Sequence, residues 1–327
     1  MTSPDDLSPA SVLSTSPAAL PLGVTWEDLA GGLPGLVSTG TATTSHVKRG
    51  QHQGGQPSTI MTLSYLGEAG RSREQTVFFK QNPPDSREGG AYRYLAPVGM
   101  SVPPLVLRLA RGDNEVLGLE FLPSIGLHPS DVDDLLDLMA TLNALTDVPA
   151  EIAMIRCGMP QTEFEQTLDV AIEEVKDRWP EHHPTRWVEL YRQAVGVHRA
   201  LPRALTHGQL AAQQVGRTRD GGLVIFDWAT LGERARLTDV ANILDDLARL
   251  SDQDERAVLT RYLRHLRRAG GGSLSDEEAW AELQLTRFVL ELEALPWRVG
   301  LKDRADLHRH VVAIAAAYPG VVRQLAA

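Results

Sequence analysis

The segment from Leu205 to Trp228 holds the polar residues with the clearest chemical potential in this sequence. It contains a polar loop, a turn at Asp220–Gly222, the apolar run Leu223–Phe226 and then the acid Asp227. This pattern predicts a loop, a small β-hairpin and a carboxylate at the end of a buried strand. Loops held by rigid elements commonly carry function, and a carboxylate so placed can hold a divalent cation. The alternative is an acid satisfied by backbone N–H groups or by an ion pair.

Two parts of different character must position this segment. From about Leu36 to Leu122 the pattern is β-rich: Thr59–Tyr65 alternates in apolar character, and Thr76–Lys80 completes a hairpin with it. A short helix is predicted around Ser86–Ala96. From about Ser130 onward, apolar residues recur at helical spacing, so the rest of the chain is predicted to be mostly helical.

With 327 residues, the chain is long enough for about two domains. Residues 1–33 are rich in Ser, Pro, Thr and Ala and are predicted to form a flexible tail. Residues 34–122 form the predicted N-terminal lobe. A linker near Phe121–Ser124 leads to a helical C-terminal lobe, residues 123–327, in which segment 205–228 is embedded.

The composition excludes several classes of protein. Hydrophobic residues make up 43% and charged residues 23% of the chain, which is ordinary for a globular protein. The formal net charge of −10 disfavours a general nucleic-acid binder. No apolar run reaches the ~18 residues of a membrane span. The single cysteine, Cys157, excludes an internal disulfide framework. We therefore expect a cytoplasmic protein that binds neither nucleic acid nor membrane.

The order of these features resembles the aminoglycoside phosphotransferase and choline-kinase-like family of small-molecule kinases. The family's catalytic loop typically reads H-G-D-L-H-x-G-N-[VI], followed by a hairpin and I-D-W. Here His207–Val215 occupies the loop, Phe226–Trp228 follows, and Asp239–Ala241 is similar to the family's D-L-A. The resemblance covers roughly Thr44 to Ala241. It implies the α+β, two-lobed fold of the protein kinases, with a β-rich N-lobe and a mostly helical C-lobe.

The resemblance implies roles for residues of the N-lobe. Kinases place a lysine on the nucleotide phosphates and hold it with a helix glutamate. These roles fall to Lys80 and to Glu88, which lies in a segment, Arg87–Pro97, similar to the family's R-E-x-x-x-Y-x-x-L-A-P. The strand that ends at Glu120 and Leu122 looks like the one leading into the hinge, whose backbone would meet adenine.

Each of these residues has a plainer interpretation when it is taken alone. Lys80 could be a solvated lysine at the end of a strand, and Glu88 could close a capping box with Asp85. The strand before the hinge could be an ordinary core strand. The glycines within Ser45–Gln56 are a weak sign of a loop that covers phosphates, and they fit a flexible turn equally well.

The resemblance also implies roles around the catalytic loop. Asp227 would hold Mg²⁺ against the phosphates of ATP, with Gln214 as a second metal ligand. His207 would hold the loop in place rather than act as a general base. Asp239 would be a buried acid that orients the loop backbone.

The residues of the loop at the family's catalytic positions differ from the family pattern. Gln209 stands where the family has its catalytic Asp, and an amide cannot take a proton near neutral pH, although its oxygen can accept a hydrogen bond. Gln214 replaces the metal-binding Asn and is one methylene longer. Ala211 replaces the loop histidine, and Arg234–Arg236 replaces the usual G-D-P.

These departures leave three hypotheses open. The chain could be a pseudokinase that binds nucleotide or a protein partner. It could be an active but atypical kinase, in which Gln209 positions the acceptor, a small hydroxyl compound for which a cationic one is the first candidate. It could also transfer the nucleotidyl group of ATP instead of the phosphoryl group. ATP and Mg²⁺ are the expected cofactors in both transfer reactions.

Overall fold

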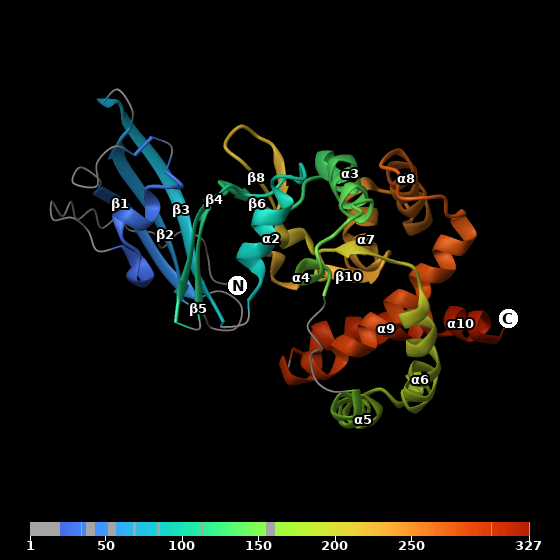
Figure 1. Cartoon of the computed structure of the whole chain (residues 1–327). Helices are drawn as coiled ribbons and strands as arrows, with labels where there is room; N and C mark the ends of the chain where they lie inside the picture. The colour runs from blue at the N-terminus through green and yellow to red at the C-terminus, as the bar shows by residue number, and fades with distance from the viewer. Residues whose placement is uncertain are drawn as a thin grey trace. The chain divides into compact units, whose positions relative to one another are not determined.

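The computed structural model describes residues 20–33, 35–36, 43–51, 57–67, 70–83, 86–112, 114–154, 161–301 and 303–326. These form two compact units (Figure 1). The N-terminal unit holds the described residues up to Pro97, together with Val102–Pro123 and Thr218–Gly221. The C-terminal unit holds the others. Cys157 lies outside the described residues.

A five-stranded antiparallel sheet forms the N-terminal unit, with strand order β1-β2-β3-β5-β4. The predicted hairpin is confirmed, because Thr59 of β2 lies opposite Phe79 of β3. One helix, α2, follows β3 in the chain, as predicted. The elements are β1 (Thr43–Gln51), β2 (Pro57–Leu66), β3 (Ser72–Asn82), α2 (Glu88–Leu95), β4 (Leu105–Arg111) and β5 (Asn114–Glu120).

Residues 20–33, which the sequence analysis assigns to a flexible tail, are part of the N-terminal unit. A short helix, α1 (Trp26–Leu29), begins with a capping box in which Thr25 accepts from the backbone N–H of Asp28 and the Asp28 carboxylate accepts from that of Thr25. Leu29 and Leu33 are buried in the same hydrophobic cluster as the sheet. Burial of these apolar side chains opposes the entropy of a loose chain. Residues 1–19 lie outside the described part.

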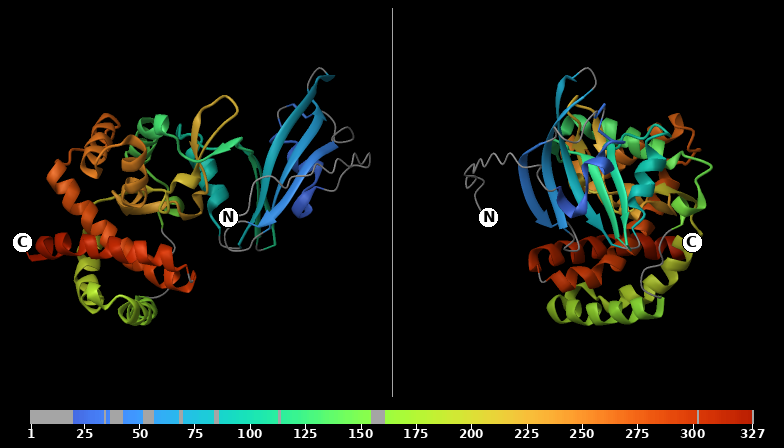
Figure 2. Two further views of the ribbon diagram at one scale, coloured as in Figure 1. Left: turned by 180° about the vertical axis from the view of Figure 1, so that it is seen from behind. Right: turned by 60° about the vertical axis from the view of Figure 1, so that its left-hand side comes forward.

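The C-terminal unit is mostly helical, as predicted. Two small sheets accompany the helices: β6-β8-β9, and the pair β7 and β10. Figure 2 shows the helices from two further sides, with α9 and α10 packed side by side. The helices are α3 (Val132–Asn143), α4 (Ala150–Ala153), α5 (Gln161–Arg178), α6 (Thr185–Ala200), α7 (Thr238–Ser251), α8 (Glu255–Arg268), α9 (Asp276–Leu301) and α10 (Arg304–Ala326). The strands are β6 (Ser124–Ile125), β7 (Arg203–Thr206), β8 (Val215–Arg217), β9 (Leu223–Ile225) and β10 (Gly232–Ala235).

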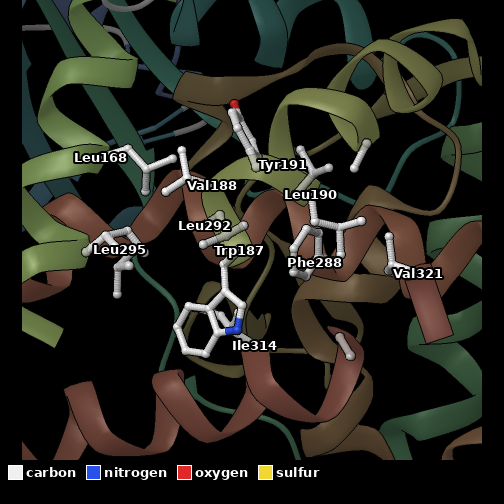
Figure 3. Packing of buried hydrophobic residues seen from close by; sticks show 14 of the residues in the cluster. Leu168, Trp187, Val188, Leu190, Tyr191, Phe288, Leu292, Leu295, Ile314 and Val321 are labelled. Atoms are coloured by element: carbon white, nitrogen blue, oxygen red, sulfur yellow. The ribbon is translucent and has the colours of Figure 1, made fainter. Parts of the chain in front are cut away.

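Helices α5, α6, α9 and α10 share one hydrophobic core (Figure 3). Trp187 and Tyr191 lie one helical turn apart on α6, so they face the same neighbours, among them Phe288 and Leu292 of α9. The Tyr191 hydroxyl points away from the other labelled side chains in Figure 3 and donates to Glu293 at 3.4 Å. None of the described helices combines the length and the apolar character needed to cross a membrane.

Candidate functional site

The loop that carries the family-like motif starts where β7 ends. β7 and β10 pair antiparallel, with Thr206 opposite Gly232, and the Thr206 hydroxyl donates to the Gly232 carbonyl at 3.1 Å. Thr206 is fully buried. The first loop residue, His207, therefore leaves a rigid two-stranded element in a fixed direction.

Asp239, in the first turn of α7, holds the start of the loop. Its two carboxylate oxygens accept the backbone N–H groups of His207 at 2.7 Å and Gly208 at 2.8 Å. Asp239 is buried, and burial raises the pKa of its carboxyl, while His207 and these two hydrogen bonds act in the opposite direction. The carboxylate thus orients two successive peptide groups of the loop.

His207 connects the loop to the strand that precedes Asp227. Its Nε2 donates to the Phe226 carbonyl at 3.0 Å, which assigns the ring proton to Nε2. The ring packs against Trp228 with a centroid distance of 4.7 Å. The side chain is fully buried, and burial lowers the pKa of the imidazole, so the ring is neutral. A neutral, enclosed imidazole suits a structural role.

Gly208 adopts a conformation and a position that only glycine fits. Its φ is +93°, in the region that L side chains rarely adopt. A Cβ atom at this residue would lie 2.6 Å from Nη1 of Arg234 and 2.8 Å from the Thr230 carbonyl oxygen. The Gly208 carbonyl accepts from the side chain of Asn242 at 3.1 Å. The loop therefore lies directly against the Arg234 guanidinium.

Gln214 and Asp227 flank the hairpin of β8 and β9: Gln214 directly precedes β8, and Asp227 comes two residues after the end of β9. The Phe226 N–H donates to the Gln214 carbonyl at 3.0 Å, so Asp227 follows the residue that faces Gln214. The Gln214 side chain is buried, and within the described part of the chain its Oε1 has no hydrogen-bond partner. Asp227 is partly exposed and has a φ of +68°, a strained backbone conformation of the kind that clusters at functional sites.

Gln209 projects from this framework. It is exposed, and its side chain makes no hydrogen bond to any other described residue. The residue that replaces the family's catalytic acid is thus accessible, whereas the residues around it are fixed by hydrogen bonds.

The N-terminal unit contains a buried ion pair between Lys80 and Glu88, the two residues predicted to act on the nucleotide phosphates. Lys80 Nζ lies 2.6 Å from Glu88 Oε2, and both side chains are buried. The Asn82 amide donates to the same Glu88 oxygen at 3.1 Å. Breaking a buried ion pair typically costs about 3–5 kcal/mol, because the remaining charge is left uncompensated. Lys80 is therefore a fixed cation rather than a solvated strand-end lysine.

Asn82 connects the Lys80–Glu88 ion pair to a second ion pair, Arg108–Glu115, which the sequence did not predict. Glu115 accepts from Asn82 at 3.3 Å and from the Gly89 N–H at 3.1 Å, and pairs with Arg108 at 2.6 Å. A Cβ at Gly89 would lie 2.6 Å from Glu115 Oε1, which explains why a glycine stands at this position of α2. No spacing rule brings Asn82, Arg108 and Glu115 together, because the strands that carry them are joined only in the folded sheet.

Glu120, Leu122 and segment 45–56 are the other positions predicted to contact the nucleotide. Glu120 is partly exposed and its N–H donates to the Pro104 carbonyl at 2.9 Å. Leu122 is buried. Their contact with adenine stays a prediction. Of the predicted phosphate-covering segment 45–56, residues up to 51 belong to β1 and residues 52–56 lie outside the described part.

Comparisons with known proteins were made for sequence and for structure. No family model matches the sequence, and no curated protein matches it significantly. Solved structures do match. A spectinomycin phosphotransferase in complex with ADP and spectinomycin aligns with a TM-score of 0.54 and 13% identity, covering 85% of this chain and 93% of that one.

Two choline kinases match in the same way. The enzyme from Cryptosporidium parvum has a TM-score of 0.56 and 11% identity, covering 88% of this chain and 91% of that chain. The enzyme from Streptococcus pneumoniae has a TM-score of 0.51 and 14% identity, and the alignment covers 86% of this chain and 94% of that chain. The chain has the kinase-like fold. The predicted two-lobed α+β architecture, shared with aminoglycoside phosphotransferases and choline kinases, is confirmed.

Within this kinase-like fold the described residues hold no cluster of three or more His, Cys, Asp or Glu side chains that could bind a metal by themselves. A site for Mg²⁺ formed by the described residues would therefore hold fewer than three of these side chains. This suits Mg²⁺, which is commonly bound through one or two carboxylates plus substrate phosphates and waters. The acceptor oxygen of Gln214 and the carboxylate of Asp227 are compatible with such a site.

We predict that Gly208→Ala destabilises the protein more than Gly221→Ala. Both glycines have a positive φ, but a Cβ at Gly221 meets nothing within 4 Å. Gly221→Ala should cost only the conformational term, about 1–2 kcal/mol, whereas Gly208→Ala adds the clash with Arg234, about 1–3 kcal/mol more. Urea unfolding of both variants, and of Gly208→Ala combined with Arg234→Ala, measures the difference. Equal losses for the two glycines, or no recovery in the double variant, would contradict this packing.

Proposed function

We propose that this protein binds a magnesium–nucleotide complex and transfers the phosphoryl group of ATP to a hydroxyl of a small molecule. The observation that carries the proposal is the buried Gln214 oxygen, which lacks a hydrogen-bond partner in the described part and lies on the same hairpin as Asp227. An unsatisfied buried acceptor costs about 1–3 kcal/mol. A bound cation would offset that cost.

The nucleotide would be held by the N-terminal unit. Lys80 would contact the phosphates as a cation whose position is fixed by Glu88. Backbone groups near Glu120 and Leu122 would contact the base. A spectinomycin phosphotransferase of the same fold has been solved with ADP, which supports this assignment.

Asp227 and Gln214 would hold Mg²⁺ in the C-terminal unit. When bound, the ion supplies positive charge that neutralises the phosphate oxygens during transfer. The protein contributes a fixed hairpin: His207 and Trp228 pack on each other, and His207 ties the Phe226 carbonyl to the loop. The carboxylate and the amide oxygen are thereby presented from one rigid element.

Transfer itself requires little covalent chemistry from the protein. The acceptor oxygen forms a bond to the γ-phosphorus, the bond to the bridging oxygen breaks, and ADP leaves. The hydroxyl proton passes to water or to a phosphoryl oxygen, because the Gln209 amide can accept a hydrogen bond but not a proton near neutral pH. Gln209 would thus orient the hydroxyl, and positioning would supply most of the rate.

A second candidate is a nucleotide-binding regulatory protein that does not turn over. The observation that favours it is the exposed amide at residue 209, which lacks the proton-accepting capacity of a carboxylate. Such a protein would use the same Lys80 and Asp227 to bind nucleotide and would present its surface to a protein partner. The two candidates therefore differ in turnover rather than in binding.

We expect Mg²⁺-dependent binding of ATP that Asp227→Asn weakens at least about tenfold, since the substitution removes one charged ligand. Calorimetric titration with and without Mg²⁺ measures it. Glu233→Gln is the matched control, because Glu233 is an exposed carboxylate of the same unit, and this variant should bind like the wild type. Absence of binding to the wild type at millimolar ATP and Mg²⁺ would refute both candidates.

We expect Gln209→Asp to raise the rate of ATP turnover by about 10²–10⁴, the usual contribution of a general base. Gln213→Asp, at an exposed position of the same loop, should change nothing. Release of phosphate or ADP is measured with a coupled assay. If the wild type turns over ATP and Asp227→Asn abolishes this turnover, the protein is an enzyme. If the turnover of the wild type does not exceed that of Asp227→Asn, the protein is the regulatory one. No gain in Gln209→Asp would show that the loop lacks the geometry for transfer.

A further inference from the structure

Arg234, on β10, is a half-buried cation without an acidic partner. Among the described residues no carboxylate oxygen lies within 4.0 Å of its guanidinium. Its neighbour Arg236 differs, because that residue pairs with Glu282 at 2.7 Å. A cation that is withdrawn from water and has no carboxylate in direct contact carries a desolvation cost that an anionic ligand would reduce.

Neutral groups hold the guanidinium in place. Nη1 donates to the Thr230 carbonyl at 2.7 Å and lies 3.4 Å from the Thr206 hydroxyl. Arginine has five N–H donors in a planar fork. Nε and Nη2 make no hydrogen bond to a described residue, and neither atom is fully buried. Two nitrogens of a fixed fork thus remain available to a ligand.

The fork lies beside the residue that would position the acceptor. Nη1 and Cζ of Arg234 are 2.6 and 2.7 Å from where a Cβ of Gly208 would be. Gln209 is the next residue, and Asp239 and Asn242 fix the Gly208 peptide group. The guanidinium of Arg234 therefore lies directly against Gly208, the residue before Gln209.

Arg234 is positively charged near neutral pH, as an arginine side chain is in proteins. Burial lowers the pKa of its guanidinium, while the Asp239 and Glu293 carboxylates oppose that effect and Arg203 adds to it. Neither carboxylate forms an ion pair with Arg234, and both Asp239 oxygens accept backbone N–H groups of the loop. Guanidinium and carboxylate or phosphate groups match in geometry, since both can form two parallel hydrogen bonds.

We infer that Arg234 binds an oxyanion of the acceptor, a carboxylate or a phosphate group, so that the acceptor is an anionic hydroxyl compound. This inference rests on the proposed function and gives its acceptor a chemical class. It departs from the cationic hydroxyl compound that the resemblance to choline and aminoglycoside kinases suggests, and the residue responsible stands where those families have G-D-P.

The experiment uses small probes on the full-length, nucleotide-free protein. Glycerate and glycerol phosphate carry a hydroxyl and an oxyanion, glycerol carries hydroxyls alone, choline carries a hydroxyl and a cation, and inorganic phosphate carries the anion alone. Calorimetry compares the wild type with Arg234→Gln, Arg234→Lys and the control Arg203→Gln. The control removes a nearby charge whose guanidinium donates to the Glu233 carbonyl at 2.6 Å.

We expect the wild type to bind glycerate or glycerol phosphate at least about tenfold more tightly than glycerol or choline. Arg234→Gln should remove that preference, Arg234→Lys should retain part of it, and Arg203→Gln should match the wild type. Inorganic phosphate should compete with the two anionic probes. ATP affinity in the presence of Mg²⁺ should change less than twofold in Arg234→Gln, which separates this inference from the nucleotide site.

Three results would overturn the inference. The first is a wild type that prefers choline or glycerol, or binds none of the anions. The second is an anion preference that survives in Arg234→Gln. The third is a loss of Mg²⁺–ATP affinity in Arg234→Gln as large as in Asp227→Asn, which would assign Arg234 to a nucleotide phosphate. If Arg234→Gln does not fold, the probe preference of the wild type and the Arg234→Lys variant decide.

Discussion

The Asp239 carboxylate accepts two successive backbone N–H groups, from His207 and Gly208, and the rest of the loop depends on this contact. Because the acid is buried, its loss would leave two N–H groups without partners, and hydrogen bonds to a charged group contribute about 1.5–3 kcal/mol each. The oriented peptides aim His207 at the Phe226 carbonyl, place Gly208 against Arg234 and leave Gln209 exposed. The same constraint thus connects the loop to the hairpin that precedes Asp227.

This constraint separates the framework of the site from its reactive group. Lys80 with Glu88 in one unit, and Asp227 in the other, are of the residue types that hold a magnesium nucleotide in protein kinases, and Gln214 has an amide oxygen in place of that of Asn. The substitution of Gln209 changes only an exposed side chain that no described residue holds. A framework fixed by buried hydrogen bonds can survive such a change without loss of stability.

Much of the fold was predictable because it follows local patterns. Helical periodicity located the C-terminal helices, and alternation located the hairpin of β2 and β3. The prediction of a flexible tail was wrong for residues 20–33. It rested on composition and overlooked the capping box of Thr25 and Asp28 and the buried Leu29 and Leu33. The partnership of Lys80 and Glu88 followed from family-like segments. The sequence did not predict the contacts of Glu115 with Asn82 and Arg108, because only the strand order brings these residues together. Arg234 differed from the family pattern, but the sequence assigned it no role.

The central claim is that the Asp239 charge fixes the loop independently of residue 209. Hydrogen exchange of the His207 and Gly208 amides, resolved by NMR, tests it most directly. In the wild type and in Gln209→Asp, both amides should be as protected as those in the middle of α7, and Asp239→Asn should accelerate their exchange by about 10–100-fold while α7 stays protected. Exchange in the wild type as fast as that of an open loop, or protection that persists in Asp239→Asn, would contradict the claim.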